Sequence, residues 1–273
     1  MTPMRKSTIS AELLATLLLT PAAATAQSSG SGEGGSLFGV SAEPVSFGPY
    51  IRAEIGVTRS SFDDATFLPP GAADPRIFFD LGDDTGGFAS VAVGYDWQNG
   101  WRGDVGLFVL GSRDASGPWV STAPPTPGPH ADIDRARVTS RAVMASVYYS
   151  PFQAQGRDRR VQPYVTAGLG VTRNKMDNWR RSNPASAQPI RTFAGASETD
   201  LAFHVGFGLA ARISKPGQRP IFLDMSYRHF DFGSVSGGTQ PIDFGASEPR
   251  EGLNFDVEDD VLSIGIRIPL QRL

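Results

Sequence analysis

Apolar and polar residues alternate with a period of two in eight segments of this chain. The clearest segment runs from Thr199 to Ile213, where every second residue from Leu201 to Leu209 is large and apolar and the residues between them are small or polar. Because successive side chains of a β-strand point to opposite faces, this pattern predicts a strand with one wholly apolar face. The other strands are predicted at about residues 50–59, 88–97, 101–110, 139–149, 162–173, 221–230 and 260–270.

The connections between these strands alternate in length. Short turns join the second strand to the third, the fourth to the fifth and the sixth to the seventh. In the turn Gln98-Asn99-Gly100, Asn99 and Gly100 are expected to supply the positive φ angles that a hairpin needs. The remaining connections are loops of roughly 25 residues, a length that is uncommon in compact soluble domains. Short turns on one rim and long loops on the other are typical of outer-membrane barrels.

The apolar faces would form the core of a soluble sandwich but would face lipid in a membrane barrel. The opposite faces carry charges, which a sandwich would expose to water. In addition, Tyr95, Trp97, Trp101 and Tyr149 lie at the short-turn ends, where an interfacial girdle is expected. We therefore predict an all-β fold, an eight-stranded antiparallel up-and-down transmembrane β-barrel with short periplasmic turns and four long extracellular loops. A soluble lipocalin-like carrier is the main alternative fold. The predicted lipid-facing residues include Val91, Val93, Val147, Leu169, Phe203, Val205, Phe207, Leu223, Ile264 and Ile266.

The inward faces of the predicted strands carry a set of charged and titratable residues. They are Arg52, Glu54, Arg102, Asp104, His204, Arg212, Asp224, Arg228 and Arg267. The interior of an eight-stranded barrel is just wide enough for side chains to fill, and buried charges must be paired. We therefore expect these residues to form an ion-pair network that plugs the lumen. A proton or small-ion conduit through the same residues is the alternative.

The first residues of the chain resemble a secretory signal peptide. Arg5 and Lys6 form a basic start, residues 13–19 form a short apolar core, and Ala24-Thr25-Ala26 is a typical cleavage site. We expect a signal peptide over residues 1–26, a flexible Gly/Ser-rich extension over residues 27–47, and a barrel domain over residues 48–273. The predicted location is the outer membrane of a Gram-negative bacterium.

Composition narrows the candidate functions. The chain has 273 residues, a formal net charge of −3 and no cysteine, so no disulfide framework is available to a secreted soluble domain. The slight acidity and the lack of a long basic stretch argue against a nucleic-acid partner. We expect no cofactor, no metal ion and no catalytic residues.

Three stretches resemble the OmpA-like and Opa-like eight-stranded outer-membrane proteins. VQPYVTAGLGVTRNK at residues 161–175 is similar to a PYxxxGxGxxxN strand of that family, LDMSYRHFDFG at residues 223–233 to its seventh strand, and GPYIRAEIGVTRSSF at residues 48–62 to its first. The resemblance covers the chain from about residue 48 and implies a membrane barrel without a peptidoglycan-binding domain. Members of this family usually end in an aromatic residue read by the barrel-assembly machinery, whereas this chain ends in IRIPLQRL.

Two patterns suggest chemistry but have simpler interpretations. Gly168-x-Gly170 and Gly206-x-Gly208 lie within predicted strands and precede no helix, so they are expected to make room for Arg and Tyr side chains from opposite strands. His229 and Ser234 near the outer rim suggest a lipid A-modifying enzyme, but the sequence shows no matching acid at a suitable spacing. We expect His229 to be a rim residue and the protein not to be an enzyme.

The predicted loops differ in charge and direct attention to surface partners. The first is acidic, whereas the third carries Lys175, Arg180, Arg181 and Arg191 as candidate contacts to lipopolysaccharide phosphates; solvated loops without a ligand are the alternative. We predict a structural or surface-interaction role in envelope integrity, adhesion or recognition. The expected partners are outer-membrane lipid, lipopolysaccharide, the barrel-assembly machinery and an unidentified surface ligand. A narrow passive porin-like channel is the alternative function.

Overall fold

The structure is a computed structural model that describes residues 48–125, 131–157, 159–185, 190–215, 219–243 and 246–270. The predicted signal peptide, the Gly/Ser-rich extension and the end of the chain at residues 271–273 lie outside the described residues. Among the residues described, no helix is long and apolar enough to cross a membrane.

Eight long antiparallel strands form the domain. They are β1 (Pro49–Leu68), β3 (Asp84–Asp96), β4 (Trp101–Ala123), β5 (Ile133–Tyr149), β6 (Val161–Met176), β9 (Ala196–Arg212), β10 (Phe222–Ser236) and β11 (Glu251–Pro269). Each strand pairs with the next along the chain, and β1 pairs with β11 from Tyr50–Pro269 to Leu68–Glu251. The ring of pairings is therefore complete, which confirms the predicted up-and-down barrel.

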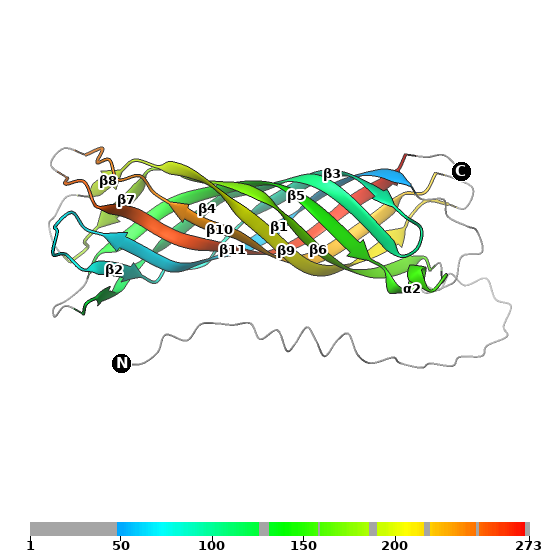
Figure 1. Ribbon diagram of the computed structural model, residues 1–273, viewed down its shortest axis with the longest axis horizontal. Helices are drawn as coiled ribbons and strands as arrows, with labels where there is room; N and C mark the ends of the chain where they lie inside the picture. Colours follow the sequence, from blue (N-terminus) through cyan, green and yellow to red (C-terminus); the bar gives the residue numbers. More distant parts are fainter. Residues whose placement is uncertain are drawn as a thin grey trace. The chain divides into compact units, whose positions relative to one another are not determined.

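The short elements mark the two ends of the barrel. The strands β2 (Arg76–Phe79), β7 (Trp179–Ser182) and β8 (Arg191–Phe193) lie together at one end, hereafter the loop end (Figure 1). The single-turn helix α2 (Pro151–Ala154) lies at the opposite, turn end (Figure 1). Short turns and longer connections therefore lie on opposite rims, as the sequence predicts.

The strands extend further toward the loop end than the sequence predicts. β4 has 23 residues and β1 has 20, whereas about 9–11 tilted residues cross a bilayer. The connections are correspondingly shorter than expected; the one between β4 and β5 covers only residues 124–132. The barrel wall thus continues well beyond the apolar part of its outer surface.

Irregular pairings explain why the predicted strands end too early. The register shifts between Asp63 and Thr66 in β1, between Leu110 and Arg113 in β4, and between Asp231 and Ser234 in β10. At each shift the parity of inward and outward residues changes, because a bulge adds an unpaired residue to one strand. In β4 the inward residues are even-numbered up to Leu110 and odd-numbered from Arg113 to Gly117. A strict period of two cannot be followed through such a shift.

The outer surface near the turn end carries a continuous apolar band. Leu169, Val93 and Phe207, all predicted to face lipid, are 62%, 64% and 58% exposed. The other predicted lipid-facing residues share this outward face; all are exposed except Leu223, which is half-buried. At the turn end, the ring of Trp101 lies 4.8 Å from that of Tyr149 and the ring of Tyr95 lies 5.8 Å from that of Trp97. This arrangement is that of an interfacial aromatic girdle.

The turn between β3 and β4 differs from the prediction in one detail. Gln98 (φ 64°) and Gly100 (φ 91°) adopt positive φ angles, but Asn99 does not. The Asn99 side chain instead accepts a hydrogen bond from the Trp101 amide at 3.1 Å, and Asp96 accepts one from the Gln98 amide at 2.9 Å. These two side-chain bonds stabilise a wider turn than the predicted Asn-Gly hairpin.

The interior toward the loop end is a packed aromatic core. Phe230 stacks on Phe232 with ring centroids 5.2 Å apart, and Phe88 and Phe108 lie within about 6 Å of Phe230. Closer to the loop end, Trp179 is fully buried and stacks on Phe193 at 4.3 Å. The part of the barrel beyond the apolar band is therefore stabilised by an apolar core like that of a soluble protein.

Candidate functional site

A four-residue ion-pair cluster crosses the barrel interior at the level of the apolar band. Glu54 on β1 accepts hydrogen bonds from Arg228 Nη1 at 2.9 Å and from Arg228 Nη2 at 2.5 Å. Arg52 pairs with both Glu54 and Asp104, and its Nε lies 2.9 Å from Asp104 Oδ2. The side chains of Arg52, Glu54, Asp104 and Arg228 are at most 1% exposed where these pairs form. Strands β1, β4 and β10 thus meet across the lumen through charge pairs.

Tyrosines and further carboxylates surround this cluster toward the turn end. Arg102 lies between two tyrosine rings, with its Cζ 4.5 Å from the centroid of Tyr148 and 4.4 Å from that of Tyr164. Arg267 Nε lies 3.1 Å from Asp224 Oδ2. Since buried guanidinium groups need such partners, these contacts offset part of their desolvation.

Two residues predicted for the charged network have other contacts. His204 is buried and packs its ring 5.0 Å from that of Phe230, and its Nε2 lies 3.0 Å from Ser146 Oγ. Arg212 is only half-buried at the turn end of β9, and its Nε donates to Ser214 Oγ at 3.3 Å. Neither residue has an ion-pair partner among the described residues. The network therefore forms without them.

Glycines in β9 create the space that these interior side chains occupy. A Cβ atom added at Gly208 would lie 2.5 Å from Tyr164 Cζ, and one at Gly206 would lie 2.8 Å from Arg228 Cγ. Tyr164 and Arg228 come from the strands that pair with β9, so the glycines accommodate neighbouring strands and not opposite ones as predicted. Any larger residue at these positions would displace the interior packing.

A second buried ion pair was not apparent from the sequence. Arg113 on β4 pairs with Asp259 on β11; both side chains are fully buried, and Arg113 also donates to Ser140 Oγ at 2.6 Å. Arg113 follows the register shift in β4, and Asp259 immediately precedes the predicted eighth strand. In the sequence, Arg113 has the odd numbering of the outward residues of this strand. It is recognised as an inward residue only when the register shift before it is known.

The loop-end mouth contains a third charged group. Arg181 on β7 is buried, and its Nε lies 2.7 Å from Asp132 Oδ2, while its Cζ lies 4.6 Å from the ring centroid of Phe67. Arg191 lies 3.4 Å from the same Asp132 oxygen. Asp134 faces inward beside Arg181 with no exposed surface, and neither of its carboxylate oxygens has a hydrogen-bond partner among the described residues.

Asp134 makes the stability of the loop end dependent on pH. Burial raises the pKa of Asp134 to about 7, against a nearby Arg181 charge that lowers it. Because the folded protein binds this proton more tightly than the unfolded chain, stability should fall as pH rises from about 4 to about 7. Asp134→Asn should flatten this dependence and stabilise the protein at pH 8 by about 1–2 kcal/mol, because it removes a buried charge. The gain is limited because the amide stays buried without a partner. Urea unfolding of the unmodified protein and of the Asp134→Asn variant across this pH range measures the effect. Equal pH profiles would contradict it.

The outer wall beyond the apolar band carries a basic flank on β5, β6 and β7. It consists of the outward residues Arg135, Arg137, Arg141, Arg173, Lys175 and Arg180. Of the four candidate lipopolysaccharide contacts, Lys175 and Arg180 belong to this flank. Arg191 is half-buried. Arg181 is no longer a candidate contact, because its guanidinium is enclosed against Asp132. Four members of this flank were not predicted from the sequence because they lie in strand extensions or at strand ends: Arg135, Arg137, Arg141 and Arg173.

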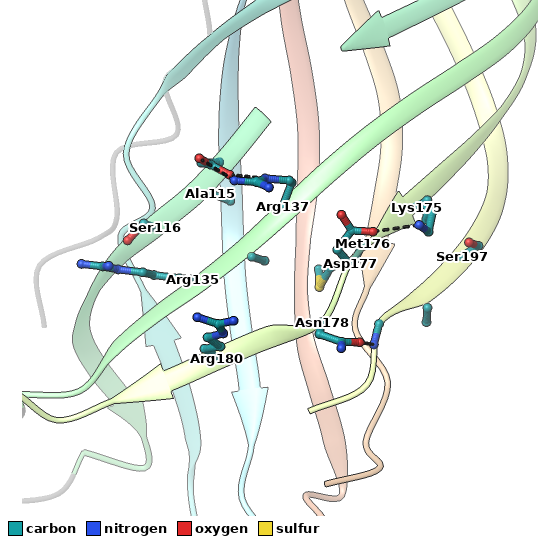
Figure 2. Close-up of a pocket in the computed structure, with 14 residues that line it drawn as sticks. Ala115, Ser116, Arg135, Arg137, Lys175, Met176, Asp177, Asn178, Arg180 and Ser197 are labelled. Carbon is teal, nitrogen blue, oxygen red and sulfur yellow. Dashed lines mark hydrogen bonds and ion pairs between the residues drawn. The ribbon is translucent and has the colours of Figure 1, made fainter. Parts of the chain in front are cut away.

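The basic flank borders a hollow on the outer wall (Figure 2). Arg135, Arg137, Lys175 and Arg180 line it, together with small residues such as Ala115 and Ser197. Two of the cations have carboxylate partners: Arg137 Nε lies 2.8 Å from Asp114 Oδ1, and Lys175 Nζ lies 2.8 Å from Asp177 Oδ1.

The opposite side of the wall carries an acidic flank on β1, β10 and β11. It consists of the outward residues Asp63, Asp231, Asp256, Glu258 and Asp260. Asp63 pairs directly across strands with Asp256, and Asp231 with Glu258. Burial and neighbouring carboxylates raise the pKa of Asp63 and of Asp256. In the ring of strands, β3 and β4 separate the two flanks on one side and β9 separates them on the other.

His229 lies within the acidic flank and has an acidic neighbour. Its Nδ1 is 3.0 Å from Asp260 Oδ1, which also accepts a hydrogen bond from the Tyr227 hydroxyl at 2.7 Å. Ser234 bonds to Asp200 instead, and no serine hydroxyl in the described part of the chain hydrogen-bonds to His229. The described residues also contain no group of three or more His, Cys, Asp or Glu side chains placed to hold a metal ion.

A closed antiparallel barrel with an apolar outer band and charged interior defines a membrane-spanning β-barrel. The chain belongs to the family of outer-membrane proteins with a β-barrel domain, because the family model described as "Outer membrane protein beta-barrel domain" matches residues 13–265. This match confirms the family resemblance. No curated protein matches the chain.

Solved structures of small outer-membrane barrels are similar to this chain. Neisserial surface protein A is 17% identical, with 81% of this chain and 97% of that chain covered and a TM-score of 0.43. OprG from Pseudomonas aeruginosa is 16% identical, with 81% and 96% covered and a TM-score of 0.48. The attachment invasion locus protein Ail of Yersinia pestis, solved with the heparin analogue sucrose octasulfate, is 14% identical, with 81% and 99% covered and a TM-score of 0.36.

Proposed function

We propose that this protein is a closed barrel of the Gram-negative outer membrane with a structural and surface-directed role. The observation that carries this proposal is the buried interior cluster of Arg52, Glu54, Asp104 and Arg228. An eight-stranded barrel has room for side chains but little more, so charge pairs spanning its interior leave no wide aqueous path. Opening such a path would break buried ion pairs, which is costly.

The aromatic core supports the same proposal independently. Phe88, Phe108 and Phe230 pack against one another above the charged cluster, and Phe108 and Phe230 have no exposed surface. An ion would therefore have to pass an apolar layer as well as the charge pairs. The two layers together favour a plug over the alternative of a proton or small-ion conduit.

The surface-directed role is assigned to the part of the barrel that extends beyond the apolar band at the loop end, which is proposed to be extracellular. The long strands raise a wall with a folded core above the membrane, which suits envelope integrity, adhesion or recognition. Lys175 and Arg180 are proposed to contact lipopolysaccharide phosphates, since both are exposed above the apolar band. We further propose that the protein is non-catalytic and that the barrel-assembly machinery inserts it after export by a cleaved signal peptide.

Conductance in a planar bilayer tests the closed barrel. Purified protein that shows the heat-dependent gel shift of a folded barrel should give no current steps above those of a protein-free bilayer. The physical reason is that both the charged cluster and the aromatic layer block the lumen. Reproducible single-channel steps from this folded preparation would overturn the proposal and support the narrow passive channel.

A further inference from the structure

We propose that the basic flank and its hollow form a binding site for the phosphorylated saccharide headgroup of lipopolysaccharide. This inference rests on the proposed surface role and names the residues and the ligand chemistry for it. The core of the site is two arginine pairs: Arg141 with Arg173 at the base of the flank, below the hollow, and Arg135 with Arg180 at the hollow itself. Three independent features of the outer wall support it: the height of the arginines, the pairing of like charges, and the shape of the hollow.

The height of the lower arginine pair, Arg141 and Arg173, matches that of a lipid headgroup. Val143 on β5 lies opposite Val171 on β6, and both are 51% exposed at the upper edge of the apolar band. Arg141 and Arg173 are the next outward residues on these strands and lie directly opposite each other. With a rise of about 3.3 Å per residue, they stand roughly 7 Å along the strands from the last apolar pair. Guanidinium groups there face the phosphorylated layer of the outer leaflet.

Like charges are paired across strands in a way that folding alone disfavours. Arg141 lies opposite Arg173, and Arg135 lies opposite Arg180. Directly opposed like charges destabilise a sheet. Within the described ranges, none of these four arginines has a carboxylate partner, whereas the neighbouring Arg137 and Lys175 do. A bound phosphate would bridge each pair and would convert the repulsion into charge-assisted hydrogen bonds.

The hollow has the size and the lining for a sugar headgroup. Its volume is about 900 Å³, at the upper end of the usual range for a small-molecule site and much larger than one phosphate needs. Gly195 precedes β9, and Ala196 and Ser197 are the first two residues of that strand. These three small residues line the hollow together with the cations (Figure 2). Asn178 and Ser116 add groups able to hydrogen-bond to sugar hydroxyls.

The distribution of charge around the barrel restricts an anionic ligand to this flank. The acidic flank on β1, β10 and β11 occupies the opposite side of the ring and begins at the same height, directly above the outward Val57 and Leu262. Phosphates would be repelled there. The site therefore gives the barrel one preferred face toward lipopolysaccharide.

The experiment is a binding titration of the full chain, folded in detergent, with fluorescent lipopolysaccharide. Arg141→Gln combined with Arg173→Gln should weaken binding by about tenfold or more, since charged hydrogen bonds to phosphate are lost. Arg135→Gln combined with Arg180→Gln should weaken it independently. For the unmodified protein, affinity should fall as the salt concentration rises.

Arg59→Gln is the matched control. Arg59 is an outward arginine one step above Val57, but it lies in β1 beside the acidic flank and pairs with Asp83 at 2.7 Å. Its replacement should leave lipopolysaccharide binding unchanged. Each variant is accepted only if it shows the heat-dependent gel shift of a folded barrel. An equal loss of affinity for the Arg59 variant, or no loss for either arginine pair, would overturn the assignment.

Two further arms identify the source of the phosphate and separate this inference from the closed barrel. Soluble glucose phosphate should compete weakly, whereas lipopolysaccharide stripped of its phosphates should not bind. If glucose phosphate competes as strongly as lipopolysaccharide, the site takes a free phosphosugar and the lipid assignment is wrong. Planar-bilayer conductance is unaffected by these outcomes, so failure of the binding site and failure of the plug are distinguished.

Discussion

Replacing Glu54 by Gln is expected to destabilise the folded barrel by about 3–5 kcal/mol, the cost of breaking a buried ion pair from one side. Glu54 contacts both Arg52 and Arg228, and Ser90 donates to it at 2.9 Å. Glutamine retains the shape but not the charge, so Arg228 remains buried without a carboxylate. Reversible urea unfolding in lipid vesicles, followed by the gel mobility shift, measures the loss.

Glu251→Gln provides the control for this change. Glu251 also pairs with an arginine, Arg76, but its side chain is 50% exposed at the loop end. An exposed pair contributes about 0–1 kcal/mol, so the control should unfold nearly like the unmodified protein. Adding Arg228→Met to Glu54→Gln should recover part of the lost stability, because it removes the unpaired charge. Similar unfolding of the Glu54 and Glu251 variants would show that the interior charges are not coupled as described.

Trp179→Ala is expected to destabilise the loop-end part of the barrel by about 3–5 kcal/mol, as for other buried aromatic truncations. Trp179 is fully buried, its ring lies 4.3 Å from that of Phe193 and 5.6 Å from that of Phe67, and its Nε1 donates to Gly238 at 2.9 Å. The loss should be local, because different parts of a protein unfold with different free energies.

Hydrogen exchange measures this local effect. Amides in β7 and β8 should lose protection in the Trp179 variant, while those of the membrane-level part of β9 should keep it. Trp97→Ala is the matched control, because Trp97 is 54% exposed at the turn end. It should leave the exchange of β7 and β8 unchanged. Uniform loss of protection through the whole barrel would mean that the extension is not a separate unit of stability.

The sequence predicts the membrane-level part of the barrel well because that part is regular. Between Tyr50 and Arg59, for example, the alternation is unbroken, and the structure pairs these residues with β11 and β3 without a shift. The same regularity places Arg52 and Glu54 on the inward face. Wherever a period of two persists, the face of each residue follows from its number alone.

The loop end could not be predicted in the same way. Arg113 turns inward only after the register shift in β4, and Arg181 is buried only because β7 pairs with the extended part of β5. The basic flank arises likewise, since Arg135 and Arg180 are 45 positions apart in the chain and become neighbours through that pairing. The sequence places four basic residues in one predicted loop: Lys175, Arg180, Arg181 and Arg191. In the structure Lys175 and Arg180 are exposed, whereas Arg181 is enclosed and Arg191 is half-buried.

By itself, the sequence determined the number of long barrel strands, their order and the direction of their apolar faces, because these follow from local periodicity and from the lengths of connections. Only the tertiary structure decided which charges meet. Glu54 and Arg228 are 174 positions apart in the chain, and Arg141 and Arg173 face each other on separate strands. Such partnerships depend on register and barrel closure, which are set by all eight strands together and not by any one segment.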